Sequence, residues 1–226
     1  MTVLLDAHGV RASMPTESGP ALILDGVSLA VAGGEIVDIV GPSGSGKTTL
    51  LRALARLLPG ATGALSLDGI PAEQISPSSW RAQVALLPQK PAIAEGDVRS
   101  NLLLPWTLRV RHGSARPDDA ALEQALAGVG LDDIALDRDA ARLSVGQVAR
   151  VALLRVLLTE PRVLLLDEPD AALDEASSEA VATLTLNFAE RGGAVVRVRH
   201  HRTDGLAARR LRLFGGRLAP EGGEAS

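Results

Sequence analysis

The chain has 226 residues, of which 46% are hydrophobic, and its formal net charge is -4. A chain of this size and composition is expected to fold as one packed domain, and no long charge run or low-complexity tract indicates disorder. The mild charge provides no basic face for nucleic acid, and the absence of cysteine excludes disulfides and thiolate chemistry. We therefore expect no nucleic-acid partner.

The sequence contains no segment that is expected to cross a bilayer. No stretch approaches the roughly 18 consecutive apolar residues that such a helix needs. The N-terminal segment MTVLLDAHGVRASMP lacks the basic start and the sustained apolar run of a signal peptide. We expect a cytoplasmic protein, and any role at a membrane would require a partner chain that supplies the membrane part.

The first predicted elements are a strand, a glycine-rich turn and a helix. Ile36–Val40 has the apolar composition of a short buried strand, and residues 48–58 carry leucines at helical spacing. The Pro-Gly pair that follows is expected to end this helix. Residues 64–67 and Val84–Leu87 are predicted to be short strands.

A mostly helical region is predicted from about Pro91 to Leu158. Within it, Asp118 and Asp119 are expected to cap a helix whose apolar residues recur on one side. These apolar residues are Leu122, Ala125, Leu126 and Val129.

Strands return in the last third of the chain. Residues 163–166 predict a central parallel strand, because a short run of Val and Leu ends there at a carboxylate. Glu175–Glu190 is predicted to be a helix, Ala194–Val198 a strand, and residues 211–218 a terminal hairpin around two glycines.

Strands near both ends and helices between them predict an α/β fold with one inserted helical lobe. We expect a single domain over residues 1–226. Its parts are a core lobe at 1–89 and 160–220, a helical lobe at 90–159 and a frayed tail at 221–226.

The segment Gly41-Pro-Ser-Gly-Ser-Gly-Lys-Thr matches the phosphate-loop pattern G-x-x-x-x-G-K-[ST] at every fixed position. Its glycines permit backbone angles that aim N–H groups into one concavity, and the following helix adds its positive end. Lys47 is expected to reach the β- and γ-phosphates and Thr48 to bind Mg²⁺. The alternative is a flexible Gly/Ser turn, which the flanking strand and helix disfavour. The expected nucleotide contacts are Gly41, Pro42, Ser43, Gly44, Ser45, Gly46, Lys47, Thr48 and Thr49.

Two adjacent carboxylates, Asp167 and Glu168, end the predicted strand at 163–166. Ligands of open α/β sheets bind beyond the carboxyl ends of the strands. Asp167 is therefore expected to hold Mg²⁺ through water, and Glu168 to polarise the attacking water. The alternative is that the two carboxylates form a helix N-cap or a solvated turn, and the phosphate loop earlier in the chain disfavours this alternative.

Further motifs give the chain a resemblance to the ATP-binding cassette (ABC) ATPases over residues 22–218. Leu143-Ser-Val-Gly-Gln resembles the family signature Leu-Ser-Gly-Gly-Gln, and Ala172-Leu-Asp resembles the D-loop. Gln89 falls at the family's lobe-linking glutamine, and His200 at its switch histidine, with His201 as the neighbouring alternative. The resemblance implies a P-loop NTPase with a RecA-like core, an antiparallel β subdomain and an inserted helical subdomain.

The resemblance also implies roles for these residues. Two chains would sandwich two ATP head to tail as a homodimer, each with Mg²⁺. Catalysis would involve Glu168, His200, Lys47 and Gln89, and the metal would be held by Thr48, Gln89 and Asp167. The facing subunit would contribute Ser144, Val145, Gly146, Gln147 and Asp174 to the nucleotide.

Two departures from the family pattern lead to hypotheses. Val145 replaces the first signature glycine, so its branched side chain should weaken ATP-driven dimerisation. The family's adenine-stacking aromatic is missing upstream of the phosphate loop, where Arg11 is a weak substitute. We expect loose base selectivity, with GTP competing well against ATP.

The resemblance favours a separate ATPase subunit of a transporter, peripheral on the inner face of the cell membrane through a transmembrane permease subunit. The segment from Pro91 to Trp106 carries apolar side chains that could meet a helix of this partner. The alternative is that Leu102, Leu103, Leu104 and Trp106 simply pack the helical lobe.

The pattern Asn101-Leu-Leu-Leu-Pro-Trp is similar to the bacterial iron-efflux ATP-binding subunits, the FetA group, whose plant relatives act in aluminium tolerance. Iron efflux is therefore the expected transport function. The alternatives are an amino-acid or phosphate importer subunit, a regulatory subunit that does not hydrolyse ATP, and an ABC protein of DNA repair or translation.

Overall fold

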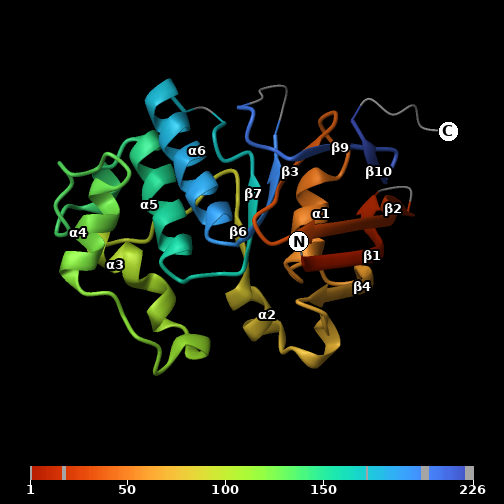
Figure 1. Cartoon of the computed structure of the whole chain (residues 1–226), viewed down its shortest axis with the longest axis horizontal. Helices are drawn as coiled ribbons and strands as arrows, with labels where there is room; N and C mark the ends of the chain where they lie inside the picture. Colours follow the sequence, from red (N-terminus) through yellow and green to blue (C-terminus); the bar gives the residue numbers. More distant parts are fainter. Residues whose placement is uncertain (1, 17–18, 172, 200–203, 222–226) are drawn as a thin grey trace.

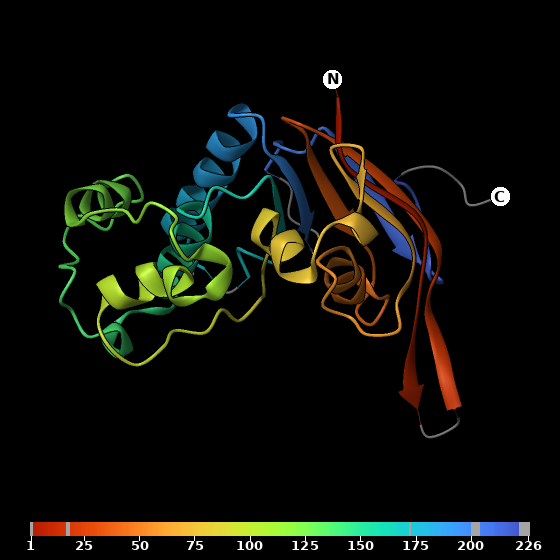
Figure 2. The ribbon, with the colours of Figure 1, turned by 90° about the horizontal axis from the view of Figure 1, so that it is seen from below.

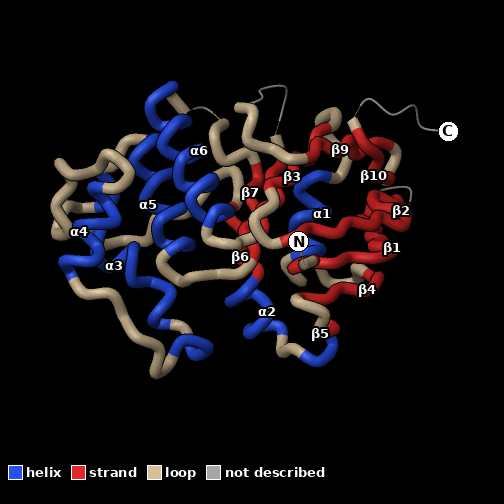
Figure 3. Tube along the Cα trace, viewed as in Figure 1, coloured by secondary structure: helices blue, strands red, loops and turns tan. Residues whose placement is uncertain are grey.

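The computed structural model describes residues 2–16, 19–171, 173–199 and 204–221, which form two sheets and a group of helices (Figure 1). Strands gather on one side of the molecule and most helices on the other, as Figure 3 shows. This mixed α/β architecture confirms the predicted fold class, including its antiparallel subdomain and its inserted helices.

The larger sheet has six strands in the order β10-β9-β3-β8-β7-β6. All neighbouring strands in it are parallel except β10, which pairs with β9 in the terminal hairpin that the sequence predicts. The strand bounds are β3 Ile36–Val40, β6 Val84–Leu87, β7 Val163–Asp167, β8 Ala194–Val198, β9 Arg209–Phe214 and β10 Arg217–Pro220.

The central strands β3, β7 and β8 are buried along their whole length, because apolar layers cover both faces of the sheet. Val163 and Leu165 of β7 pack into a cluster with the helix α1 (Lys47–Leu54). Leu164 and Leu166 point the other way, into a cluster with the helices α5 (Val145–Leu157) and α6 (Glu175–Glu190). Strands covered on both faces have near-continuous apolar runs, which is the pattern that predicted β7.

The smaller sheet is antiparallel, with the order β2-β1-β4-β5. Its strands are β1 Val3–Thr16, β2 Gly19–Ala32, β4 Thr62–Leu67 and β5 Ile70–Pro71. The residue patterns alone predicted no strand before Ile36, although β1 and β2 are the longest in the fold. Register shifts between Val3 and Ser13 interrupt their alternation, which explains why the pattern was not apparent. Figure 2 shows the far end of this hairpin projecting from the body of the molecule.

The helix α1 ends four residues earlier than the predicted helix at 48–58, at Leu54. Arg56 takes a left-handed backbone conformation with φ 53°, which cannot continue the helix. Its guanidinium donates to the carbonyls of Ala72 and Ile75 at 2.6 and 2.8 Å. Leu58 still packs against the core from the loop, so its apolar spacing imitated a longer helix.

The helical lobe has a core of its own, with Val98, Leu102, Leu122 and Leu126 packed against α5. Its helix α4 (Asp119–Ala127) begins at the predicted cap, where Asp118 accepts a hydrogen bond from the N–H of Ala121. The other helices are α2 (Pro77–Gln83), beside the core lobe, and α3 (Val98–Leu103). Among the described residues, no helix has the length and apolar character needed to cross a membrane.

Candidate nucleotide site

The phosphate loop connects the end of β3 to the start of α1. Its glycines at 41, 44 and 46 have φ of 153°, 77° and 98°, in the region that disfavours other residues. A Cβ on Gly41 would lie 2.3 Å from the carbonyl oxygen of Leu213, and one on Gly46 would lie 2.8 Å from Ile23 Cγ2. The loop is thus held between the terminal hairpin and β2, and only glycine fits at these two contacts.

Two polar side-chain groups of this loop are buried. Lys47 is buried at 6% exposure, and its Nζ donates to the carbonyls of Gly41 and Pro42 at 2.8 and 2.9 Å. Ser45 Oγ is buried and has no hydrogen-bond partner within the described chain. A buried ammonium beside an unsatisfied hydroxyl at a helix N-terminus suits a phosphate group.

Thr48 and Asp167 meet beside the loop although they are far apart in the sequence. The Thr48 hydroxyl donates to Asp167 Oδ2 at 2.9 Å, and Asp167, the last residue of β7, is 6% exposed. A hydroxyl and a carboxylate next to a phosphate site are the oxygen ligands that Mg²⁺ prefers. These residues therefore fit the metal expected from the sequence.

Gln89 and Glu168 also meet, since the strands β6 and β7 are neighbours in the sheet. Gln89 Nε2 donates to Glu168 Oε2 at 2.6 Å. Glu168 has a left-handed backbone with φ 50°, and its N–H donates to the carbonyl of Val198 at 3.0 Å. The ends of β6, β7 and β8 thus place the Gln89 amide, the Glu168 carboxylate and the Val198 carbonyl close to one another.

The signature segment lies at the N-terminus of α5. Ser144 caps this helix: its hydroxyl accepts from the N–H of Gln147 at 3.3 Å, and Gln147 Oε1 accepts from the N–H of Ser144 at 2.9 Å. Val145 is 68% exposed, so the start of α5 is open to solvent. A Cβ on Gly146 would lie 2.4 Å from Ser177 Oγ, which gives this glycine a packing role against α6.

Asp174 caps α6 next to the signature segment. Its carboxylate accepts from the N–H of Ser177 at 2.7 Å, and this hydrogen bond lowers its pKa. Within the described chain, no hydrogen bond or ion pair joins Ser144–Gln147 or Asp174 to the phosphate loop. The predicted D-loop residue Ala172 and the predicted His200, with its neighbour His201, lie outside the described residues.

Residue patterns did not predict a group of buried charges at the carboxyl end of β8. Arg197, within the otherwise apolar β8, is 2% exposed, and Arg199, just beyond the end of β8, is 6% exposed. Arg197 donates to Asp38 at 2.7 and 3.1 Å and to Asp204 at 2.8 and 3.0 Å. Arg199 donates to Asp170, and its Nη1 lies 2.5 Å from Asp204 Oδ2.

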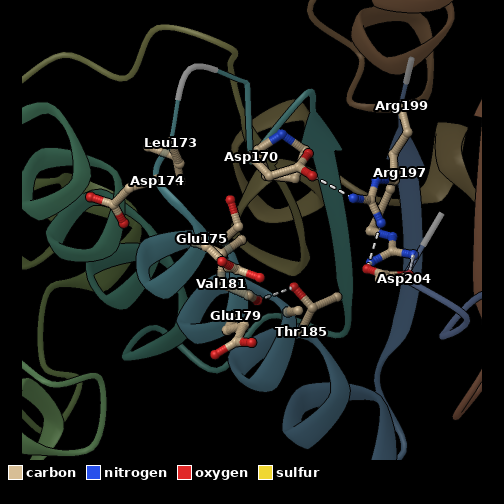
Figure 4. Close-up of a pocket in the computed structure, with 13 residues that line it drawn as sticks. Asp170, Leu173, Asp174, Glu175, Glu179, Val181, Thr185, Arg197, Arg199 and Asp204 are labelled. Carbon is tan, nitrogen blue, oxygen red and sulfur yellow. Dashed lines mark hydrogen bonds and ion pairs between the residues drawn. The ribbon is translucent and has the colours of Figure 1, made fainter. Parts of the chain in front are cut away.

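Arg197, Arg199, Asp170 and Asp204 line a cavity of about 780 Å³ between α6 and the end of β8 (Figure 4). Burial tends to raise the pKa of Asp204, but hydrogen bonds from Arg197 and the Leu206 N–H outweigh it and lower the value to about 2. For Arg197, burial opposes the charged form, yet the bonds to Asp204 and Asp38 raise its pKa. The sequence signal for this group was a pair of arginines two positions apart, one within the apolar strand β8 and one just after its end.

Comparison with known proteins agrees with this geometry. The family model described as "ABC transporter" matches residues 24–171. The chain is 42% identical over 97% of its length to "Hemin import ATP-binding protein HmuV" of Nocardia farcinica (strain IFM 10152), covering 77% of that protein. It is 35% identical over 83% of its length to "Probable iron export ATP-binding protein FetA" of Escherichia coli (strain K12), covering 82% of that protein.

Another relative is "Protein STAR1" of Oryza sativa subsp. japonica, 42% identical over 79% of this chain and 51% of that protein. Among solved structures, "Structure of a bacterial Atm1-family ABC exporter with ATP bound" has a TM-score of 0.80 and 28% identity, covering 96% of this chain and 38% of that one. A solved ATP-binding subunit of an ABC transporter has a TM-score of 0.79 at 23% identity, covering 96% and 90%, and shows the shared fold. The chain belongs to the ABC transporter family, and it is an ATP-binding protein of the type that couples ATP hydrolysis to transport.

Proposed function

We propose that this chain is the ATP-hydrolysing subunit of an ABC transporter, and that two copies close around two ATP to drive a separate transmembrane permease. One observation carries the proposal: two side-chain pairs meet at the carboxyl ends of the strands, beside the loop that holds Lys47. These pairs are Thr48 with Asp167 and Gln89 with Glu168. The first pair provides oxygen ligands for Mg²⁺, and the second provides a base for the attacking water and an amide that holds this base.

Different residues of the chain have different roles in ATP hydrolysis. Lys47 and the loop N–H groups bind the phosphates, and Thr48, Asp167 and Gln89 would hold Mg²⁺. When bound, Mg²⁺ neutralises phosphate charge. Glu168 orients the attacking water and accepts its proton, and Gln89 keeps that carboxylate in place. His200 contacts the γ-phosphate in this scheme.

The second copy supplies the missing side of the site. The exposed start of α5 supports this, because Val145 is 68% exposed and, within the described chain, no hydrogen bond or ion pair joins this segment to the phosphate loop. Ser144, Gly146 and Gln147 of one copy would then contact the ATP held by Lys47 of the other. Asp174, which caps α6 beside Gly146, would lie at the same interface.

Glu168→Gln and Lys47→Ala test this function by separating hydrolysis from binding. We expect Glu168→Gln to reduce ATP turnover by at least about 100-fold while retaining nucleotide binding, since it removes the base alone. With ATP and Mg²⁺ it should elute as a dimer in size-exclusion chromatography with light scattering. Lys47→Ala should lose binding itself. Normal turnover in Glu168→Gln, or a monomer at saturating ATP, would contradict the proposal.

For the permease, we propose a docking surface on the helical lobe and a place on the inner face of the cell membrane. Leu102 and Leu103 pack the lobe itself, which favours the alternative reading for these two residues. Leu104, Leu108 and Val110 are 38%, 55% and 40% exposed, so apolar surface remains for a partner helix. Co-purification of a multi-span protein with the parent chain, reduced by Leu108→Asp, would support this surface.

We propose iron efflux as the transport function, as the name of the FetA relative suggests, with hemin import as the second candidate. The second rests on the HmuV relative, which matches almost the whole chain. Deleting the chain's gene in its host separates the two. Sensitivity to added iron is the expected result for efflux, and failure to grow on hemin as the iron source is the result for import. A defect in amino-acid or phosphate uptake would contradict both.

A further inference from the structure

The end of β8 carries two arginines in a place where a parallel sheet normally buries apolar side chains. Arg197 and Arg199 follow Val195 and Val196, which belong to the apolar clusters on the two faces of the sheet. Burying a guanidinium is costly unless carboxylates pair with it. The two arginines find these partners in different parts of the chain.

Arg197 forms the inner half of the network. Its guanidinium donates two hydrogen bonds to Asp38 of β3 and two to Asp204, which follows β8. This half fastens β8 to its neighbour β3 and does not reach the acidic turn after β7. The pairing with Asp38 and Asp204 is sufficient to explain why Arg197 can be buried.

Arg199 forms the outer half, and it does reach that turn. Its Nη2 donates to Asp170, while Nη1 pairs with Asp204. Asp170 lies two residues beyond Glu168 in a turn that the Ala171 N–H closes onto the carbonyl of Glu168 at 3.1 Å. Figure 4 shows Asp170 facing the two arginines across the pocket.

Within the described residues, a backbone hydrogen bond and an ion pair join the turn to the same strand end. The first is the backbone bond from the N–H of Glu168 to the carbonyl of Val198, at 3.0 Å. The second is the ion pair from Arg199 to Asp170. A left-handed backbone such as that of Glu168 persists only where its surroundings hold it firmly. Removing the second contact removes the restraint that Arg199 places on the turn.

We propose that Arg199 is a positioning residue for ATP hydrolysis: its ion pair with Asp170 clamps the turn at 168–171 to β8 and so aims the Glu168 carboxylate. This inference rests on the proposed role of Glu168 as the base. Arg199 itself touches neither nucleotide nor water in this scheme. It acts through Asp170 and the backbone of the turn.

Three variants test the clamp: Arg199→Met, which removes the charge but keeps an apolar stem, Asp170→Asn, and the two combined. We expect each single variant to lower kcat about 10- to 100-fold, since small misplacements of a reacting group have effects of that size. KM for ATP and the Kd of a fluorescent ATP analogue should stay within about 3-fold, because the phosphate loop is untouched. The double variant should be no worse than the poorer single one, as expected for two halves of one interaction.

Two further variants distinguish positioning from mere stability. Arg199→Lys keeps a cation near Asp170 and should recover part of kcat. Arg162→Met is the matched control, because it removes an arginine from the half-exposed pair with Asp68, at 3.0 Å, and should leave kcat unchanged. Unfolding midpoints are measured for all variants, and kcat is compared well below the lowest midpoint.

The outcomes are distinct. If Arg199→Met does not fold, Asp170→Asn carries the test, since it leaves Arg199 paired with Asp204. Parent-like kcat in folded Asp170→Asn, additive losses in the double variant, or a KM effect without a kcat effect would overturn the inference. Normal turnover in Glu168→Gln would instead overturn the proposed function, so the two failures can be told apart.

Discussion

The glycines of the site are required by packing and backbone conformation, whereas the valine at position 145 is not. Gly41 and Gly46 are required by the fold, because a Cβ would collide with Leu213 or Ile23 and because φ is positive. Gly146 is required by its contact with Ser177 of α6. Val145, in contrast, stands exposed in the first turn of α5 with no such constraint. The effect of this valine should therefore appear only when a partner surface or a phosphate approaches.

Val145→Gly tests this expectation at the residue scale. We expect ATP turnover to rise about 2- to 10-fold and dimerisation to need less ATP, because the glycine lets phosphate approach the N–H groups of α5 more closely. The loss of stability should be below about 1 kcal/mol, the usual difference in helix propensity. Turnover at several ATP concentrations and light scattering measure both effects. Val145→Ala serves as the control, and a rate in the glycine variant equal to or below the parent's would contradict the idea.

At the scale of elements, β8 was predicted with its correct bounds, but its function in the fold was not. The apolar stretch identifies a buried strand, and nothing local indicates which carboxylates its arginines meet. Asp38, Asp170 and Asp204 come from three separate segments, and only the strand order β3-β8-β7 brings them to one place. The pairing also lowers the pKa of the Asp204 carboxyl group.

Asp204 should therefore make stability depend on pH. Its folded pKa of about 2 lies below the ordinary value of 3.8, so its ion pairs stabilise the folded chain above about pH 4 and lose that effect as the pH falls through about 2. We expect Asp204→Asn to be less stable than the parent at pH 7, with about half of the difference left at pH 3. Urea unfolding at both values measures it.

Asp68→Asn, at the half-exposed pair with Arg162, is the control and should show a small difference at every pH. An equal deficit of Asp204→Asn at pH 7 and pH 3 would show that its hydrogen bonds, and not its charge, are responsible. Arg197 stays protonated over this range, since its pairs raise its pKa.

At the scale of the whole molecule, the expectation of loose base selectivity depends on which side chains lie near the phosphate loop. Arg11, the weak substitute for the stacking aromatic, lies on β1 with its Nε 3.6 Å from Asp25 Oδ1. Trp80 is buried beneath α1, where its Nε1 donates to the carbonyl of Leu54, and Trp106 belongs to the helical lobe. The β2 residue Ile23, which touches Gly46, brings an aliphatic surface to the loop instead.

We therefore expect GTP to compete with ATP. Aliphatic contact is less selective between purines than a specific stacking and hydrogen-bonding pocket, because it recognises no exocyclic group. The kcat/KM values of the two nucleotides should lie within about 5-fold of each other, and GTP should inhibit ATP hydrolysis at a similar concentration. Parallel phosphate-release assays measure this. A preference for ATP of about 100-fold or more would contradict the expectation.

The sequence by itself determined the family and the fold class, and it located the phosphate loop, because these depend on residue types at fixed local spacing. It also located β3, β7, β8 and α6, whose apolar patterns are short and regular. The long β1–β2 hairpin, the early end of α1 and the charges around β8 were decided by tertiary structure. In each case, residues distant in sequence supply the hydrogen bonds and packing that local patterns cannot record.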